Sequence, residues 1–549
     1  MFMNAVLKNK VPYLVNSIIV ILLFCICLMG NKDNSQIGFS HSMFMVITSF
    51  ALTGILMSSF PTFASCLLLL LSIGLAAYET AYGALQLIGI IAPGNYSLAC
   101  TGSFANAGPY GGFLAVIISI LAANSFFGSN KITRNITTIA IFVPLVMLPA
   151  TQSRSALLAL SCSMFFLAVR KESIRNRLIT ILKKCGVLIV PGVCILVVGA
   201  YLFKKPSADG RLFMNKMSII TMRTNGWDGV GSGHFGGAFG ESQARYFSSQ
   251  IAQLGGNDID WGAIKEKERL MANAADNAFN EYLFIGVEYG PIAMILFVGI
   301  IAFAIIISIK RNTVWGYGLI TFAVFEFFSY PLHIKQFQIL FSVLLAACLF
   351  DNNEQKIKGR GLFITMADIL VLFIAATLMI PSWRKYKQAE FTWEKTERWH
   401  QMECYDFVVE DCEKLYTYMK DDYRFLFTYG QALNKTGYYE KSDSILKMGS
   451  EISSDPMFWN VMGNNSLALG RYREAEDRYK HAFYMIPNRL YPLYLLAKLY
   501  YTENDTVRFV DISNRIEGFI PKVESQNTER LRSEIRDLKS TLFQITVNE

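Results

Sequence analysis

The chain has 549 residues, of which 52% are hydrophobic and 13% aromatic, and its mean hydropathy is +0.32. A soluble globular protein carries fewer apolar residues, and here they come in long blocks rather than at a helical period. The net charge of +8 does not indicate a nucleic-acid partner, because the basic residues gather between the apolar blocks.

The apolar blocks end near Pro381, and the chain from Ser382 to Glu549 is charged and amphipathic. We therefore predict an all-α protein with a polytopic membrane domain over 1–381 and a soluble domain over 382–549. A helix needs about 20 apolar residues to cross a bilayer. Eleven segments approach that length, at about 11–30, 42–60, 62–92, 110–127, 137–150, 155–169, 187–203, 283–308, 314–330, 337–350 and 362–380.

Positive charge is concentrated in alternate connections between these spans. Cytoplasmic loops carry an excess of Lys and Arg, so the pattern predicts a cytoplasmic N-terminus. With eleven spans, the long connection 204–282 and the tail lie on the outer face. The basic residues are Lys8 and Lys10; Lys131 and Arg134; Arg170, Lys171, Arg175, Arg177, Lys183 and Lys184; Lys310 and Arg311; Lys356, Lys358 and Arg360.

The segment TGSFANAGPYGGFLA, at 101–115, leads into the fourth span from the outside. Asn106, Gly108 and Pro109 are typical of a helix start. The N–H groups at such a start attract anions. Ordinary turn chemistry before a membrane helix explains the same residues, so both interpretations stay open.

Arg154 lies in the tight turn TQSR between the fifth and sixth spans. An arginine in hydrocarbon costs about 2.5 kcal/mol or more at the bilayer centre, and less toward the interface. Its side chain either extends from a helix end to the interface or binds an anion on the outer face.

The outer loop 204–282 carries four cations around a glycine-dense turn, GSGHFG at 231–236, which contains His234. The turn matches GxGxxG, but no βαβ unit surrounds it, so a nucleotide site is not indicated. Its backbone N–H groups can hold an anion, and a plain flexible loop is the alternative. The four cations are Arg211, Lys216, Arg223 and Arg245.

The segment ADNAFNEYLFIGVEYG, at 275–290, returns to the membrane and is predicted as a helix. Asp276 and Asn280 would share one face of that helix, and Glu281 and Glu288 approximately so. Carboxylates this near to hydrocarbon are costly, which makes them functional candidates. For Asp276, a helix cap is the alternative interpretation.

The tail contains an internal repeat with the length of a tetratricopeptide unit. Small residues in it let two helices pack closely, and large residues fill the space between them. The pattern predicts an α-solenoid of the tetratricopeptide type, which binds peptides or proteins on a concave face, and a generic array of helical hairpins is the alternative. The residues at the repeat positions of 456–487 are Trp459, Gly463, Gly470, Tyr472, Ala475, Tyr479, Ala482 and Pro487.

The ten cysteines show no CxxC or Cys/His spacing, so we predict neither a metal nor another cofactor.

Four of these segments resemble, in order and spacing, the O-antigen ligase superfamily of membrane glycosyltransferases. The superfamily includes the ligases, related polymerases and O-linked protein oligosaccharyltransferases. The resemblance covers roughly 100–350 and rests on 101–115, the Ser-Arg turn at Arg154, the outer loop and 279–290.

The resemblance implies transfer of a glycan from undecaprenyl diphosphate to an acceptor hydroxyl on the periplasmic face of the bacterial inner membrane. The acceptor would be a lipid or a protein. Arg154 and Arg211 would bind the diphosphate, since a guanidinium pairs bidentately with phosphate and stays charged. The expected substrate-binding residues further include Arg223, Arg245, Asn106, Asn280 and Glu281.

The sequence departs from the family at one position. The ligases carry a histidine directly before the Asn that corresponds to Asn280, and here that residue is Phe279. Asp276 is the first substitute as proton acceptor, followed by His234 and His333. We interpret His333 as an interfacial residue without chemistry.

Three other functions fit parts of the pattern. A polysaccharide polymerase uses the same donor. A transporter needs polar residues at mid-depth in several spans, whereas the charges here gather on the outer face. In a non-enzymatic assembly scaffold, the repeats would bind a protein partner and the arginines would only reach the interface.

Overall fold

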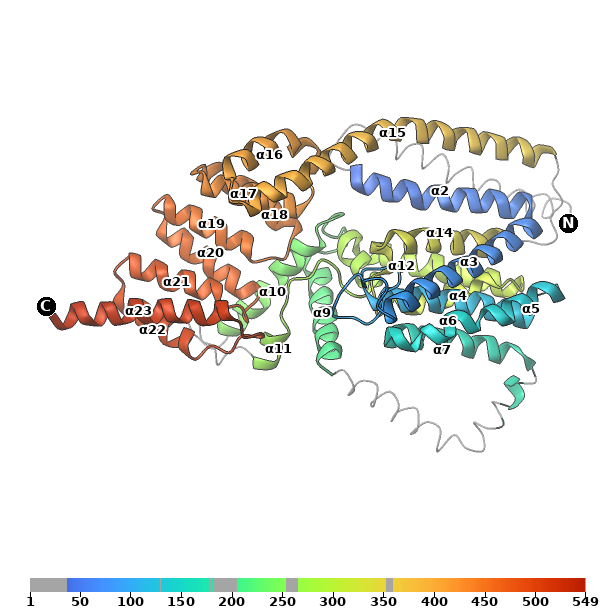
Figure 1. Cartoon of the computed structure of the whole chain (residues 1–549), viewed down its shortest axis with the longest axis horizontal. Coiled ribbons are helices and arrows are strands. Elements are labelled where there is room, and N and C mark those ends of the chain that lie inside the picture. Colours follow the sequence, from blue (N-terminus) through green and yellow to red (C-terminus); the bar gives the residue numbers. More distant parts are fainter. Residues whose placement is uncertain are drawn as a thin grey trace. The chain divides into compact units, whose positions relative to one another are not determined.

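The computed structural model describes residues 37–128, 130–172, 174–177, 180, 205–252, 265–351 and 359–548, and these are all-helical with no strand among them (Figure 1). The predicted all-α class is confirmed for this part of the chain. The predicted spans at 11–30 and 187–203 lie outside the described residues. The chain divides into two compact units, which are described one at a time.

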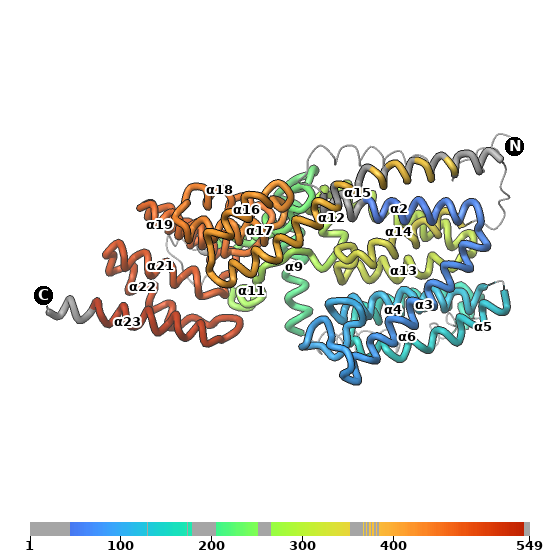
Figure 2. Tube along the Cα trace, turned by 45° about the horizontal axis from the view of Figure 1, so that its top comes forward, coloured from blue at the N-terminus to red at the C-terminus, as the bar shows by residue number. Residues whose placement is uncertain are grey.

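Unit 1 comprises Met1–Lys205, Phe279–Tyr282 and Ala293–Arg384. Within it α14 packs against both α2 and α13 (Figure 2). Helix α4 packs against α3, α5, α7 and α13. Its helices are α2 (Ile37–Ser59), α3 (Pro61–Leu87), α4 (Ala107–Phe127), α5 (Lys131–Ala140), α6 (Phe142–Met147), η2 (Pro149–Thr151), α7 (Arg154–Arg170), α13 (Trp315–Glu326), η4 (Pro331–His333) and α14 (Lys335–Phe350), with most of α12 (Glu281–Lys310) and of α15 (Gly359–Gln401).

Four helical segments of the described residues are long and apolar enough to cross a membrane: Pro61–Leu87, Ala107–Phe127, Lys131–Thr151 and Glu281–Lys310. Two shorter apolar helices cover Phe44–Ser59 and Lys335–Phe350. These segments fit a helical membrane protein, and the full count of eleven spans stays a prediction.

Helix α4 forms the core of unit 1 because it is apolar on every side and buried over most of its length. Two glycines in its first turns allow close packing. A Cβ at Gly112 would lie 2.3 Å from the Phe325 ring, and one at Gly111 would lie 2.7 Å from Thr151 Oγ1. The start of α4 therefore lies directly against the end of α13 and the turn before α7.

The helix predicted over 275–290 begins later than the sequence suggested. Residues 272–280 are not helical, and α12 starts at Glu281. The reason is local: Phe279 has a φ of 49°, a left-handed conformation that ends a helical path. The prediction that Asp276 and Asn280 share a helical face is thus wrong, as is the helix cap by Asp276.

Unit 2 comprises Pro206–Ala278, Leu283–Ile292 and Lys385–Glu549, so the segment predicted as an outer loop packs in the same unit as the tail. That segment is largely helical. Its helices are α9 (Lys205–Thr224), α10 (Phe235–Ala252) and α11 (Glu266–Met271), and those of the tail are α16 (Tyr405–Met419), α17 (Tyr423–Lys435), α18 (Tyr439–Ile452), α19 (Met457–Ala468), α20 (Tyr472–Met485), α21 (Tyr491–Thr502), α22 (Thr506–Glu517) and α23 (Gln526–Asn548).

The tail contains three successive helical hairpins: α17–α18, α19–α20 and α21–α22. Their first helices start at equal intervals along the chain, at Tyr423, Met457 and Tyr491. The turns repeat as well, with positive φ at Gly437, Gly470 and Asn504. A helical repeat is therefore present, and its assignment to the tetratricopeptide type stays a prediction.

The same small-on-large contact recurs in two hairpins. A Cβ at Gly430 would lie 2.5 Å from the Leu446 side chain, and one at Gly463 would lie 2.3 Å from the Tyr479 ring. Both glycines precede their partner by the same interval along the chain. This is the packing that the sequence pattern predicts for each hairpin.

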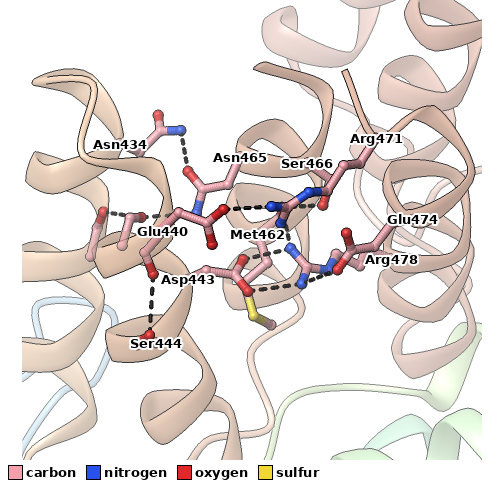
Figure 3. A network of polar contacts seen from close by, with 12 residues as sticks. Asn434, Glu440, Asp443, Ser444, Met462, Asn465, Ser466, Arg471, Glu474 and Arg478 are labelled. Atoms are coloured by element: carbon pink, nitrogen blue, oxygen red, sulfur yellow. Dashed lines mark hydrogen bonds and ion pairs between the residues drawn. The ribbon is translucent and has the colours of Figure 1, made fainter. Parts of the chain in front are cut away.

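A polar network also ties one hairpin to the next (Figure 3). Arg478 of α20 donates to both carboxylate oxygens of Asp443 in α18, at 2.5 and 2.8 Å. It donates as well to the Met462 carbonyl at 2.7 Å and to Glu474 at 2.6 Å. Since the Arg478 side chain is only 16% exposed, these bonds are shielded from water.

Arg478→Lys is expected to lower the free energy of unfolding by about 1–3 kcal/mol, because a lysine cannot form the bidentate pair. Thermal unfolding of the detergent-solubilised chain should show a lower transition temperature. The matched control is Lys414→Ala, which removes a pair with Glu410 in which the two side chains are 66% and 64% exposed. Such an exposed pair contributes little, so the control should change the transition little. Equal transition temperatures for the two variants would refute this role.

Candidate functional site

The residues predicted to form the site fall into both units. Unit 1 holds Asn106, Arg154, Asn280 and Glu281, together with Phe279 and His333. Unit 2 holds Arg211, Arg223, His234, Arg245 and Asp276.

Two helix starts lie side by side in unit 1, and Arg154 is at one of them. Ser153 caps α7 by accepting from the Ala156 N–H at 3.4 Å, and its hydroxyl donates to the Gly108 carbonyl in the first turn of α4 at 3.3 Å. Asn106 caps α4 by accepting from the Gly108 N–H. The N–H groups and dipoles of both helices, with a half-buried guanidinium, favour an anion at this end of the unit.

Two buried polar residues of α3 hold the loop that leads into α4. The Gln86 carboxamide oxygen accepts from the Thr101 and Gly102 N–H groups at 2.8 and 2.9 Å. The Glu79 carboxylate accepts from the Ser103 N–H at 3.0 Å and from its hydroxyl at 2.5 Å. Both side chains are at most 5% exposed. They were not among the residues predicted from the sequence, although polar residues inside an apolar span are a signal for such a role.

Glu281, the first residue of α12, pairs with His333 in η4. The Glu281 side chain is 1% exposed, and its Oε1 lies 3.3 Å from the His333 Nδ1. The same oxygen accepts from the Leu332 N–H at 2.6 Å. His333 therefore has a specific carboxylate partner. The interpretation of His333 as an interfacial residue without chemistry did not predict this pair.

A second buried carboxyl, Glu326, lies near this pair. Its side chain is fully buried, and its Oε2 is 3.2 Å from the Tyr282 hydroxyl. Its Oε1 has no hydrogen-bond partner among the described residues. Glu326 was not among the residues predicted from the sequence, although a single carboxyl inside an apolar span marks a functional candidate.

Glu326 and Arg154 lie at a similar depth on antiparallel helices. The Ser163 hydroxyl of α7 donates to the Tyr317 carbonyl of α13 at 2.9 Å. Arg154 is nine residues before Ser163, and Glu326 is nine residues after Tyr317. Since α13 ends where α4 and α7 begin, the arginine and the buried carboxyl share one end of unit 1.

The glycine turn of unit 2 binds a carboxylate of the protein itself, that of Glu288. The Val230 and Gly231 N–H groups donate to the Val287 and Glu288 carbonyls at 3.0 and 2.9 Å. The Gly233 N–H donates to the Glu288 carboxylate at 2.8 Å. These three amides are thus engaged within the protein, and a substrate anion would have to displace Glu288 to use the third.

His234 lies in the same turn, half-buried, with its Nδ1 2.9 Å from the Ser232 carbonyl. Because a carbonyl only accepts, Nδ1 carries the ring proton.

The cations of unit 2 differ in their surroundings. Arg245 is exposed and donates to Glu241 at 2.9 Å, while His481 Nε2 lies 3.2 Å from the other oxygen of Glu241. His481 and Arg245 hold the pKa of Glu241 down to about 2, against the opposing effect of burial. On α9, Arg211 is half-buried and Arg223 is exposed.

Asp276 is exposed in the non-helical segment before α12, and one of its oxygens accepts from the Tyr423 hydroxyl at 3.4 Å. The described residues contain no group of three or more His, Cys, Asp or Glu side chains placed to hold a metal ion.

The sequence matches no protein-family model, and no curated protein matches it significantly.

Proposed function

We propose that the chain is a membrane glycosyltransferase of the O-antigen ligase type, which transfers a glycan from undecaprenyl diphosphate to an acceptor hydroxyl. The observation that carries the proposal is Arg154 at the paired starts of α4 and α7. A guanidinium beside two helix N-termini suits a diphosphate leaving group, because positive potential meets the charge that grows as the bond breaks.

The residues of unit 1 have separate roles in this proposal. Arg154 binds the diphosphate, and Asn106 fixes the first turn of α4, whose N–H groups face the same charge. Glu79 and Gln86 hold the preceding loop in place, so the anion site is formed before the donor arrives. In unit 2, Arg211 and Arg223 add positive charge that attracts the donor or the acceptor.

The proposal includes the topology and the tail. The membrane domain spans the bacterial inner membrane about eleven times and presents Arg154 on the periplasmic side. The helical hairpins of the tail are of the tetratricopeptide type and bind the acceptor or a partner that presents it. A tethered binding domain raises the local concentration of one acceptor without touching the reacting atoms.

Binding of the carrier tests the proposal before any transfer is measured. The purified full-length chain is incubated with undecaprenyl diphosphate and, separately, with undecaprenol, and native mass spectrometry measures the retained lipid. We expect selective retention of the diphosphate. Equal retention of the alcohol would show that only the polyprenyl tail is bound, and retention of neither lipid would favour a scaffold.

A further inference from the structure

The Glu281–His333 pair has a defined proton arrangement. The Glu281 Oε1 receives the Leu332 N–H and faces the His333 Nδ1. A carboxylate oxygen can only accept, so Nδ1 carries the ring proton and the neutral imidazole keeps its basic lone pair on Nε2. A carboxylate in this position also stabilises the imidazolium that forms when Nε2 takes up a proton.

The neighbouring carboxyl, Glu326, has a different partner. The Tyr282 hydroxyl donates to the Ala323 carbonyl at 2.8 Å and to the Glu326 Oε2 at 3.2 Å. Of the two carboxyls, Glu281 is the one that faces His333.

The pair lies at the same end of unit 1 as Arg154. Phe337, four residues after His333, is fully buried and packs its ring 5.7 Å from Phe104 and 5.8 Å from Phe113. These two residues flank the start of α4. The His333 side chain is 30% exposed, so a solute can reach the ring.

We propose that His333 is the proton acceptor of the transfer reaction and that Glu281 is its positioning residue. The inference rests on the proposed function and deepens it. The acceptor O–H bond breaks, with its proton passing to Nε2 of His333. The oxygen forms a bond to the anomeric carbon of the glycan, and the bond from that carbon to the diphosphate breaks. Undecaprenyl diphosphate leaves with the electron pair, and Arg154 balances its charge.

The pH dependence follows from the groups around His333. They are Glu281 and Tyr282 on α12, Glu326 on α13, Tyr330 with its ring 6.5 Å away, and the exposed Lys335 at the start of α14. Of these, Glu281 is the carboxyl that pairs with the ring, at 3.3 Å from Nδ1. The wild-type rate should fall on the acid side as the imidazole becomes protonated and can no longer accept a proton.

The experiment measures transfer by the purified full-length chain from the native lipid-linked glycan, as a function of pH. His333→Ala should lower kcat by about a hundredfold or more and remove the acidic limb of the profile, while carrier binding is kept. Glu281→Gln should lower kcat less and move the acidic limb to lower pH, because the imidazolium loses its counter-charge. His333→Gln, which keeps an N–H donor toward Glu281, covers the case in which the alanine variant fails to fold. His400→Ala in α15 is the matched control.

The outcomes separate the inference from the proposed function. If the wild type transfers glycan and His333→Ala and His333→Gln keep both the rate and the acidic limb, the inference is overturned and the proposed function stands. The same holds if Asp276→Asn or His234→Ala removes the limb instead. If the wild type binds carrier but transfers nothing, the proposed function fails and this inference fails with it.

Discussion

Arg154→Ala is expected to lower kcat for glycan transfer by about a hundredfold to a thousandfold, the usual effect of removing one preorganised donor to developing charge. Arg154 is the first residue of α7, whose start lies beside that of α4, so we expect its charge to add to that of two helix N-termini. Arg154→Lys should recover only a small part of the rate, because an ammonium loses the bidentate geometry. Transfer measured at saturating donor separates this loss from weaker binding.

The matched control is Arg170→Ala, which changes the arginine at the other end of the same helix. Arg170 donates to Asn312 and has no place in the proposed site. The control should transfer at close to the wild-type rate. If Arg154→Ala transfers glycan with the wild-type kcat, the assignment of Arg154 to the leaving-group site is contradicted, independently of the result for Arg170→Ala.

A chain that ends at Arg384 is expected not to yield folded, monodisperse protein. The truncation removes α18 and α20, the tail helices that pack against α10. Phe235, Phe239 and Phe247 of α10 are at most 1% exposed and belong to an apolar cluster that includes Tyr479 and Phe483 of α20. Burial of a Phe side chain is worth about 1.5–3 kcal/mol, so loss of three approaches the total stability of a typical domain, about 5–15 kcal/mol. Size-exclusion chromatography in detergent should show aggregation.

A single substitution tests the same packing without truncation. A Cβ at Gly237 in α10 would lie 2.1 Å from the Glu451 carbonyl oxygen of α18, whereas the space around a Cβ at Gly210 in α9 is open. Gly237→Ala should lower the thermal transition, since overpacking costs about 1–3 kcal/mol, and Gly210→Ala should not lower it. A monodisperse truncated chain, together with an unchanged transition in Gly237→Ala, would contradict this account of unit 2.

The elements with strong local patterns could be predicted from the sequence. Long apolar blocks identify Pro61–Leu87 and Ala107–Phe127 as helices that can cross a membrane, because length and hydropathy are properties of the segment alone. The hairpins were predictable because a small residue followed at a fixed spacing by a large one, such as Gly463 and Tyr479, recurs along the tail.

Long-range packing could not be predicted in the same way. Gly236 was interpreted as the end of a flexible anion-binding turn, yet Gly236 and the following Gly237 and Gly240 fit against backbone and side chains of the distant tail. The helix break at Phe279 was also missed, since a positive φ at a phenylalanine has no sequence signal. The partnership of Glu281 with His333 depends on how α12 meets η4.

The most direct test of the central claim is mass analysis of a transfer reaction. The purified full-length chain in nanodiscs is given the native undecaprenyl-diphosphate-linked glycan with three acceptors: a glycolipid, a second lipid-linked glycan, and a protein with exposed Ser and Thr hydroxyls. One acceptor is expected to gain the mass of the glycan while an equal amount of undecaprenyl diphosphate is released, and Arg154→Ala is expected to show neither change. An unaltered mass for all three acceptors, with the donor intact and the carrier bound, would contradict the central claim.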